Sequence, residues 1–219
     1  KMRAATRKII EREKIMAIIR GIYGEELVEL SKALYEGGIR CLEITYDQSD
    51  ENTLSRIKKE LETLNEIFKG DLTIGVGTVL TVEQVRNAKE AGAKFVVSPH
   101  MDKKLVDEAI KEDLVSIPGA MTPTEIVEAD LSGADFVKFF PAGTMGYKYI
   151  KDIMAPLNHV KYIATVGVTE ESCYEYLKMG FAGVGISSRL TDRKLIAEKN
   201  FKELTNRAKR FVEIADEFK

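Results

Sequence analysis

The sequence predicts an α/β protein in which eight parallel strands and the helices between them close into a single (β/α)8 barrel. Short β-branched and apolar runs alternate with helical patterns along the whole chain. The 219 residues, 44% of them hydrophobic, can bury one sizeable core, and no linker-like segment divides positions 1–219. An open doubly wound sheet is the alternative, but no Gly-x-Gly-x-x-Gly motif opens the first helix, and the glycine pair at 75 and 77 lacks the later glycine.

The strand-like runs follow one another at regular intervals. They cover positions 15–20, 39–45, 72–78, 94–98, 114–118, 135–140, 159–165 and 181–187. A short extra helix over 4–12 precedes the first strand. Between the second and third strands, apolar residues recur at spacings of 3, 4, 3 and 4, as one face of a helix requires; they are Leu54, Ile57, Leu61, Leu64 and Phe68.

Residues typical of helix ends support these boundaries. Four helices are predicted to end at glycine just before a strand, at positions 37–38, 92, 133 and 180, because the left-handed position after a helix favours glycine. Two helices begin with capping signals, Thr81 with Gln84 and the segment 122–125, whose sequence Thr-Pro-Thr-Glu combines a capping box with proline at the first helical position.

Composition and charge exclude several kinds of partner. The net charge of −2 and the interspersed acidic and basic residues provide no basic field for nucleic acid. The segment 1–14 lacks the apolar core of a signal peptide, and no stretch approaches the ~20 apolar residues of a membrane span. Two cysteines, Cys41 and Cys173, form no disulfide framework and fit a reducing compartment. A cytoplasmic protein without a membrane partner is therefore expected.

Lys138 lies in an unusually apolar segment, DFVKFFP at 135–141. Burial penalises the charged form of an amine, so a lysine here is pushed toward the neutral form that attacks carbonyl carbon. This suggests imine chemistry. A lysine that a carboxylate neutralises for structural reasons alone is the other interpretation, since buried ion pairs also shift pKa values.

Polar residues gather where the predicted strands end. In a barrel these carboxyl ends converge on one mouth, where chemistry is done. The residues are Arg20, Glu43 with Thr45, Thr78, the segment Ser98, Pro99 and His100, Pro118 with Gly119, Lys138, Thr165 with Gly167, and Ser187 with Ser188. Ser98, Pro118 and Lys138 are each 20 positions apart, which predicts matching heights around the barrel.

Glu43 is the second candidate catalytic residue. Strand alternation places it on the same face as Cys41 and Thr45, and one strand face is the barrel interior. A buried carboxyl group that faces a buried amine can form an imine, because the amine attacks a keto carbon while the carboxyl group moves protons. As an ion pair alone the two residues would stabilise the fold weakly at best. Their place at the mouth favours chemistry.

The remaining polar candidates have simpler roles. His100 and His159 are the only histidines, and the second falls at the start of its strand, so they cannot build a two- or three-histidine metal site together. His100 either contacts substrate or bonds within a loop. Arg20 suits a substrate carboxylate, unless it is an exposed loop residue. Thr45 and Thr78 either orient substrate or cap the next helix.

Several motifs together resemble the class I aldolases that cleave 2-keto-3-deoxy-6-phosphogluconate and 4-hydroxy-2-oxoglutarate. They are GVGTVL at 75–80, VSP at 97–99, IPG at 117–119, MTPTE at 121–125 and, most specifically, VKFFPA at 137–142. The resemblance runs from about Ile15 to Leu190. It implies a homotrimeric barrel that releases pyruvate from a small 2-keto acid without metal or organic cofactor. It also implies that Lys138 is the Schiff-base lysine, Glu43 the proton-transfer residue and Thr78 a contact of the pyruvate carboxylate.

The chain departs from this pattern in three places. Asp47 stands where many members have arginine, and Arg20 is expected to take over the carboxylate. The glycine pair after the seventh strand is Val166-Gly167, and Ser187 replaces a glycine of the last phosphate loop. Because backbone N–H groups meet phosphate best where no side chain intrudes, we expect a weakened phosphate site. The candidate substrate-binding residues are Arg20, Thr78, Pro99, Thr165, Gly167, Ser187 and Ser188.

Two rival functions remain. One is a barrel enzyme that binds sugar phosphate without a lysine imine. The other is an assembling structural subunit, for which Val166 and Ser187 would reflect relaxed constraint on the site.

Overall fold

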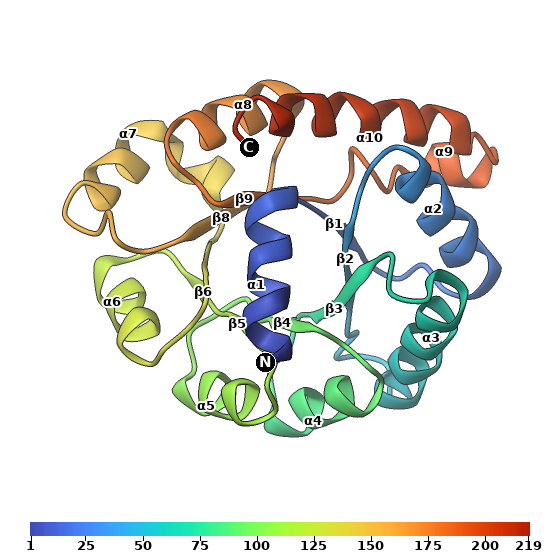
Figure 1. Cartoon of the computed structure of the whole chain (residues 1–219), viewed down its shortest axis with the longest axis horizontal. Coiled ribbons are helices and arrows are strands. Elements are labelled where there is room, and N and C mark those ends of the chain that lie inside the picture. The colour runs from blue at the N-terminus through green and yellow to red at the C-terminus, as the bar shows by residue number, and fades with distance from the viewer.

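Parallel strands close into a ring that is surrounded by helices (Figure 1). The structure is a computed structural model and describes residues 1–219. The strands are β1 (Ile15–Ile19), β2 (Cys41–Thr45), β3 (Thr73–Gly77), β4 (Phe95–Val97), β5 (Val115–Ile117), β6 (Gly119–Ala120), β7 (Val137–Phe139), β8 (Tyr162–Thr165) and β9 (Gly183–Ile186). Their order in the sheet is β5-β4-β3-β2-β1-β9-β8-β7-β6. The predicted (β/α)8 barrel is confirmed.

Helices that follow the strands lie around the outside of the ring, and one further helix precedes the first strand. They are α1 (Met2–Glu13), α2 (Gly24–Glu36), α3 (Thr53–Phe68), α4 (Val82–Glu90), α5 (Lys103–Lys111), α6 (Pro123–Leu131), α7 (Ala142–Met154), α8 (Glu170–Lys178), α9 (Arg193–Ala197) and α10 (Phe201–Asp216). The side chain of Thr122 caps α6 in a capping box with Glu125, and Thr81 caps α4 by accepting from the Gln84 N–H. The glycines expected after the helices do adopt positive φ, for example +98° at Gly38.

The fifth predicted strand, 114–118, is divided in the structure. β5 pairs with β4, whereas β6 pairs with β7, and Pro118 lies between them. Proline has no N–H with which to continue a ladder, so nine strand segments occupy eight strand positions. One detail of the predicted register was wrong: Lys138 lies level with Gly119 and not with Pro118.

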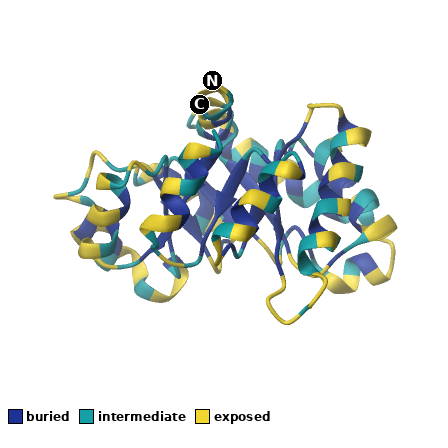
Figure 2. Cartoon of the chain, turned by 90° about the horizontal axis from the view of Figure 1, so that it is seen from below, coloured by how far each residue is buried: buried dark blue, intermediate teal, exposed yellow.

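Helix α1 lies across one end of the barrel (Figures 1 and 2). Its Ile10 packs into a buried cluster inside the ring with Met16, Cys41 and Phe136, among others. Arg3 anchors the helix through a 2.8 Å ion pair with the buried carboxylate of Asp135. Since α1 covers the end where strands begin, the polar residues that end the strands lie at the opposite mouth.

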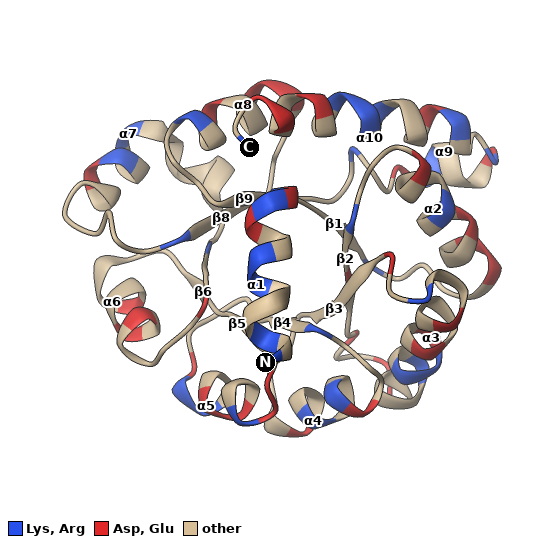
Figure 3. Cartoon of the chain, viewed as in Figure 1, with Lys and Arg blue, Asp and Glu red and all other residues tan.

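Acidic and basic residues are interspersed along the outer helices (Figure 3). No helix is both long and apolar enough to cross a membrane.

Candidate active site

Lys138 and Glu43 are both buried inside the barrel near its open mouth. Lys138, on β7, is 8% exposed, and Glu43, on β2, is 2% exposed. In the ring of eight strand positions β2 and β7 stand on opposite sides, so the two side chains extend toward each other across the interior. They form no ion pair within 4.0 Å, and neither makes a hydrogen bond.

Burial changes the protonation of both groups. It lowers the pKa of the Lys138 amine, an effect that the nearby Glu43 carboxylate opposes. Burial also raises the pKa of Glu43, against the influence of Lys138 and Arg20. The Lys138 Nζ lies 4.6 Å from the centre of the Phe140 ring. An amine nearer neutrality and a carboxyl group nearer its protonated form are suited to nucleophilic attack and proton transfer.

Gly77 on β3 provides the space that Glu43 occupies. A Cβ atom at this position would lie 1.7 Å from Glu43 Oε1. In the sequence Gly77 belongs to the glycine pair at 75 and 77 and to the GVGTVL motif, and neither pattern predicts a role beside Glu43. The distance shows that the glycine is required for the position of the carboxyl group.

We therefore expect Gly77→Ala to displace the Glu43 carboxyl group and lower kcat/KM by about 10²-fold, the scale of a 1 Å misplacement. Steady-state kinetics of the wild type and the variant measure this loss. In a Glu43→Gln background, Gly77→Ala should cost much less, because the group that it displaces no longer functions. A full additional loss in that background would show that the alanine acts elsewhere.

Arg20 and Thr78 meet at one side of the mouth. Arg20 extends from the end of β1, and its Nη1 donates to Thr78 Oγ1 over 3.2 Å. Together with Gly21, Tyr46, Asp47, Gln48 and Ser49 they line a cleft of about 410 Å³. A guanidinium and a hydroxyl group in one open cleft can both hydrogen-bond to a carboxylate.

Thr45 and Thr165 face the interior and cap no helix. Both hydroxyl groups are buried without a hydrogen-bond partner. The N-cap residues of the helices that follow their strands are Asn52 and Thr169 instead. Helix capping, one of the two interpretations left open for Thr45 and Thr78, is therefore excluded for both. The N-cap of the helix after Thr45 is Asn52, and the N-cap of the helix after Thr78 is Thr81. Buried unpaired hydroxyl groups beside a mouth are available to a ligand.

The ends of β8 and β9 present a second group of possible contacts. Val166 is 44% exposed and has φ +77°, and Gly167 has φ +69°. Ser187 and Ser188 are exposed. The main-chain N–H groups of Gly167, Ser187 and Ser188 donate no hydrogen bond within the chain. These donors remain free for an anion, beside an apolar side chain that a glycine would not present.

Pro99 and His100 follow β4 on the other side of the mouth. Pro99 is half-buried, and a Cβ at Gly119 would lie 2.4 Å from its carbonyl, so Gly119 allows close packing there. His100 is exposed, whereas His159 lies 3.2 Å from Asp130. No three His, Cys, Asp or Glu side chains lie close enough to hold a metal ion.

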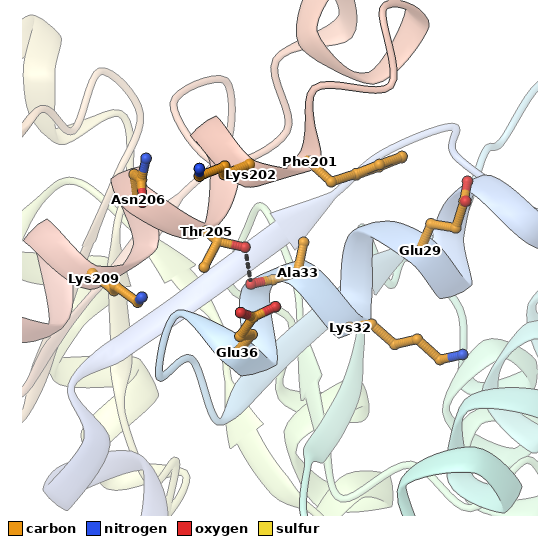
Figure 4. Close-up of a pocket in the computed structure, with 9 residues that line it drawn as sticks. All are labelled: Glu29, Lys32, Ala33, Glu36, Phe201, Lys202, Thr205, Asn206 and Lys209. Atoms are coloured by element: carbon orange, nitrogen blue, oxygen red, sulfur yellow. Dashed lines mark hydrogen bonds between the residues drawn. The ribbon is translucent and has the colours of Figure 1, made fainter.

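A groove of about 460 Å³ on the outer wall lies between α2 and α10 (Figure 4). It is lined mainly by polar and charged side chains, including Lys32, Lys202 and Lys209, and none of the predicted site residues reaches it. The candidate active site is therefore the barrel mouth.

A closed barrel with its buried amine and carboxyl group at the mouth is the architecture of a (β/α)8-barrel enzyme. The chain belongs to the KDPG and KHG aldolase family, whose model matches residues 6–207. Aldolases are lyases, so the chain is a lyase.

Individual relatives agree with this assignment. The chain is 34% identical over 170 residues to the 2-dehydro-3-deoxy-phosphogluconate aldolase of Treponema pallidum, and the matched segment covers 77% of each protein. It is also 34% identical over 177 residues to a probable 2-dehydro-3-deoxy-6-phosphogalactonate aldolase of Rhizobium meliloti, covering 80% and 81%. Among solved structures it resembles the KDPG aldolase of Legionella pneumophila, with a TM-score of 0.82, 29% identity, and coverage of 93% and 96%. Pyruvate was captured in that protein as a covalent carbinolamine intermediate.

Proposed function

We propose that this chain is a class I aldolase that cleaves a small 2-keto acid to pyruvate and an aldehyde through a Schiff base on Lys138. One observation supports this most strongly: Lys138 and Glu43 are buried across the barrel mouth from each other without forming an ion pair. The covalent carbinolamine of the Legionella relative supports an amine that attacks pyruvate. The substrate is either a 2-keto-3-deoxy-6-phospho sugar acid or 4-hydroxy-2-oxoglutarate, and the aldehyde is glyceraldehyde 3-phosphate or glyoxylate.

Imine formation begins with the neutral amine. Lys138 Nζ attacks C2 of the keto acid, and the resulting carbinolamine loses its hydroxyl group as water after protonation by Glu43. The raised pKa of Glu43 makes the protonated form available for this step. The imine carries a positive charge on nitrogen and can accept an electron pair.

Cleavage then uses Glu43 as a base. The Glu43 carboxylate takes the proton of the C4 hydroxyl group, the C3–C4 bond breaks, and its electrons move into the imine to give an enamine. After the aldehyde departs, Glu43 returns a proton to C3, and hydrolysis releases pyruvate. The imine is the electron sink throughout, so the mechanism requires no metal or organic cofactor.

The remaining residues bind the substrate. Arg20 and Thr78 hold the carboxylate in the cleft that they share. Thr165 offers its unpaired hydroxyl group beside the imine, and Pro99 forms part of the wall. Gly167, Ser187 and Ser188 contact the far end of the substrate. A homotrimer and a cytoplasmic location stay predictions from the family resemblance and the composition.

The rival functions are each open to a test. Buried Lys138 and Glu43 argue against a purely structural subunit, and release of pyruvate from the candidate keto acids decides the matter. A barrel enzyme that works without an imine would release product but would not be inactivated by borohydride in the presence of pyruvate.

We expect a terminal phosphate to improve kcat/KM by less than the ~10²-fold that one or two charge-assisted hydrogen bonds would give, because the exposed Val166 side chain crowds the free N–H donors. Val166→Gly should raise this preference. Removing a β-branched residue from φ +77° should also increase the free energy of unfolding by about 1 kcal/mol, since the strain exceeds the entropy cost of glycine.

Rates with phosphorylated and unphosphorylated keto acids, measured for both proteins, check this expectation. A wild type that already favours the phosphorylated substrate by ~10³-fold or more, unchanged in Val166→Gly, would contradict it. The serines after β9 would then supply the phosphate site.

A further inference from the structure

A line of side-chain amides connects the start of α4 with the carboxylate cleft. The Leu80 N–H donates to Gln84 Oε1 over 2.7 Å, and Gln84 Nε2 donates to Gln48 Oε1 over 2.9 Å. Gln48 Nε2 then donates to the main-chain carbonyl of Thr78 over 2.7 Å. Each amide uses its oxygen on one side and its nitrogen on the other. The line therefore has a direction, from Leu80 to Thr78.

Gln84, at the α4 end of this line, is held in place by its surroundings. Gln84 is 5% exposed and belongs to α4. The hydroxyl group of Tyr46, whose side chain is 1% exposed, lies 3.0 Å from the Gln84 main-chain carbonyl and 2.7 Å from Asn87 Oδ1. Buried polar groups that are fully bonded hold one geometry, so Gln84 presents a fixed donor to Gln48.

Thr78, at the other end of the line, has a backbone conformation that threonine does not readily adopt. Thr78 has φ +55°, a conformation that is uncommon outside glycine and costs energy unless its surroundings maintain it. The Gln48 bond to its carbonyl and the Arg20 bond to its hydroxyl oxygen both act on this residue. The orientation of the Thr78 side chain in the cleft thus depends on Gln48.

We propose that Gln48 is a positioning residue for the carboxylate of the 2-keto acid, an inference that rests on the proposed function. Gln48 need not touch the substrate. It fixes Thr78, and through Thr78 the guanidinium of Arg20, in the arrangement that receives the carboxylate. The Gln48 amide accepts from Gln84 through its oxygen and donates to Thr78 through its nitrogen, so one side chain completes both hydrogen bonds.

Three variants test the proposal. Gln48→Met removes both hydrogen bonds without adding charge. Gln48→Glu keeps the acceptor for Gln84 but replaces the donor with an oxygen that repels the Thr78 carbonyl. Asn52→Asp, in the same loop, adds the same charge at an exposed side chain that makes no capping bond, and serves as the control. For each variant we measure the concentration of carbonyl compound that gives half of the maximal borohydride-trapped adduct. The compound is pyruvate in one series and acetone, which has a carbonyl but no carboxylate, in the other.

We expect Gln48→Met to raise the half-saturation concentration for pyruvate by about 3–10-fold, and Gln48→Glu by at least as much, as loss of one or two hydrogen bonds predicts. The value for acetone should stay within about twofold in every variant, and Asn52→Asp should leave both values unchanged on that scale. The maximum adduct at saturation should equal that of the wild type.

Unchanged half-saturation for pyruvate in Gln48→Met would overturn the proposal, and so would equal increases for pyruvate and acetone, which indicate a general disturbance of the site. A wild type that forms no adduct with pyruvate would overturn the proposed function as well. The two failures are therefore distinguishable.

Discussion

Lys138→Ala is expected to lower kcat/KM for aldol cleavage by about 10⁵-fold or more, the order seen when a covalent nucleophile is removed. No other lysine can replace it, because Lys138 alone among the lysines is buried. Without its amine, C2 of the substrate cannot form an imine and the electrons of the C3–C4 bond have no acceptor. Cleavage kinetics with a pyruvate-coupled assay measure the loss.

Two further substitutions at this position show that the loss is chemical. Lys138→Arg keeps a positive charge, but the guanidinium stays protonated and does not attack a carbonyl, so it should be as inactive as Lys138→Ala. Lys138→Met keeps the chain length and removes the buried charge. An active Lys138→Arg enzyme would contradict the role of the amine.

Lys138→Met should also be more stable than the wild type at neutral pH. Burial lowers the folded-state pKa of Lys138 below its ordinary value of 10.5, so the unfolded chain binds the proton more tightly and the wild type gains stability as pH rises toward 10.5. The stability advantage of the variant should therefore shrink as pH rises through this window. Chemical denaturation at neutral and alkaline pH follows the difference.

Glu43→Gln is expected to lower kcat by ~10²–10⁴-fold, the usual contribution of general acid–base catalysis. The amide has nearly the shape of the carboxyl group, so it fits the space that Gly77 leaves, but it cannot carry a proton between C4, C3 and solvent. The fold should persist, because Glu43 makes no ion pair or hydrogen bond whose loss would destabilise it.

Exchange of the pyruvate methyl protons with solvent isolates this step. In the mechanism Glu43 removes and returns these protons on the imine, so the exchange rate should fall with kcat in Glu43→Gln, while the borohydride-trapped adduct still forms at a lower rate. Exchange at the wild-type rate would show that another group carries the proton. Glu43 would then only orient the substrate.

The sequence predicted the barrel because its signals are local. Each strand is a short apolar run, and several helices begin or end next to a residue with a known cap preference, such as Thr122 or Gly180. The division of the fifth strand is not predictable from the run 114–118, in which Pro118 is simply the last residue. A missing N–H donor affects pairing with a neighbour, and neighbours are not visible in a local pattern.

The candidate site was predicted unevenly for the same reason. Lys138 and Glu43 are conspicuous because charged residues are rare in buried strands, and alternation predicts which way they face. Gln48 and Gln84 are separated by 36 positions and belong to a polar loop and a helix, where glutamine is unremarkable. Their link to Thr78 depends on the way β2 and β3 place their following loops side by side, which no spacing in the sequence reveals.

Borohydride reduction in the presence of pyruvate, followed by mass mapping of the peptides, tests the central claim most directly. One reduced pyruvate should be found on the peptide that contains Lys138, with matching loss of activity, and neither should occur in Lys138→Ala. Labelling of a different lysine, or labelling that persists undiminished in Lys138→Ala, would contradict a Schiff base at Lys138.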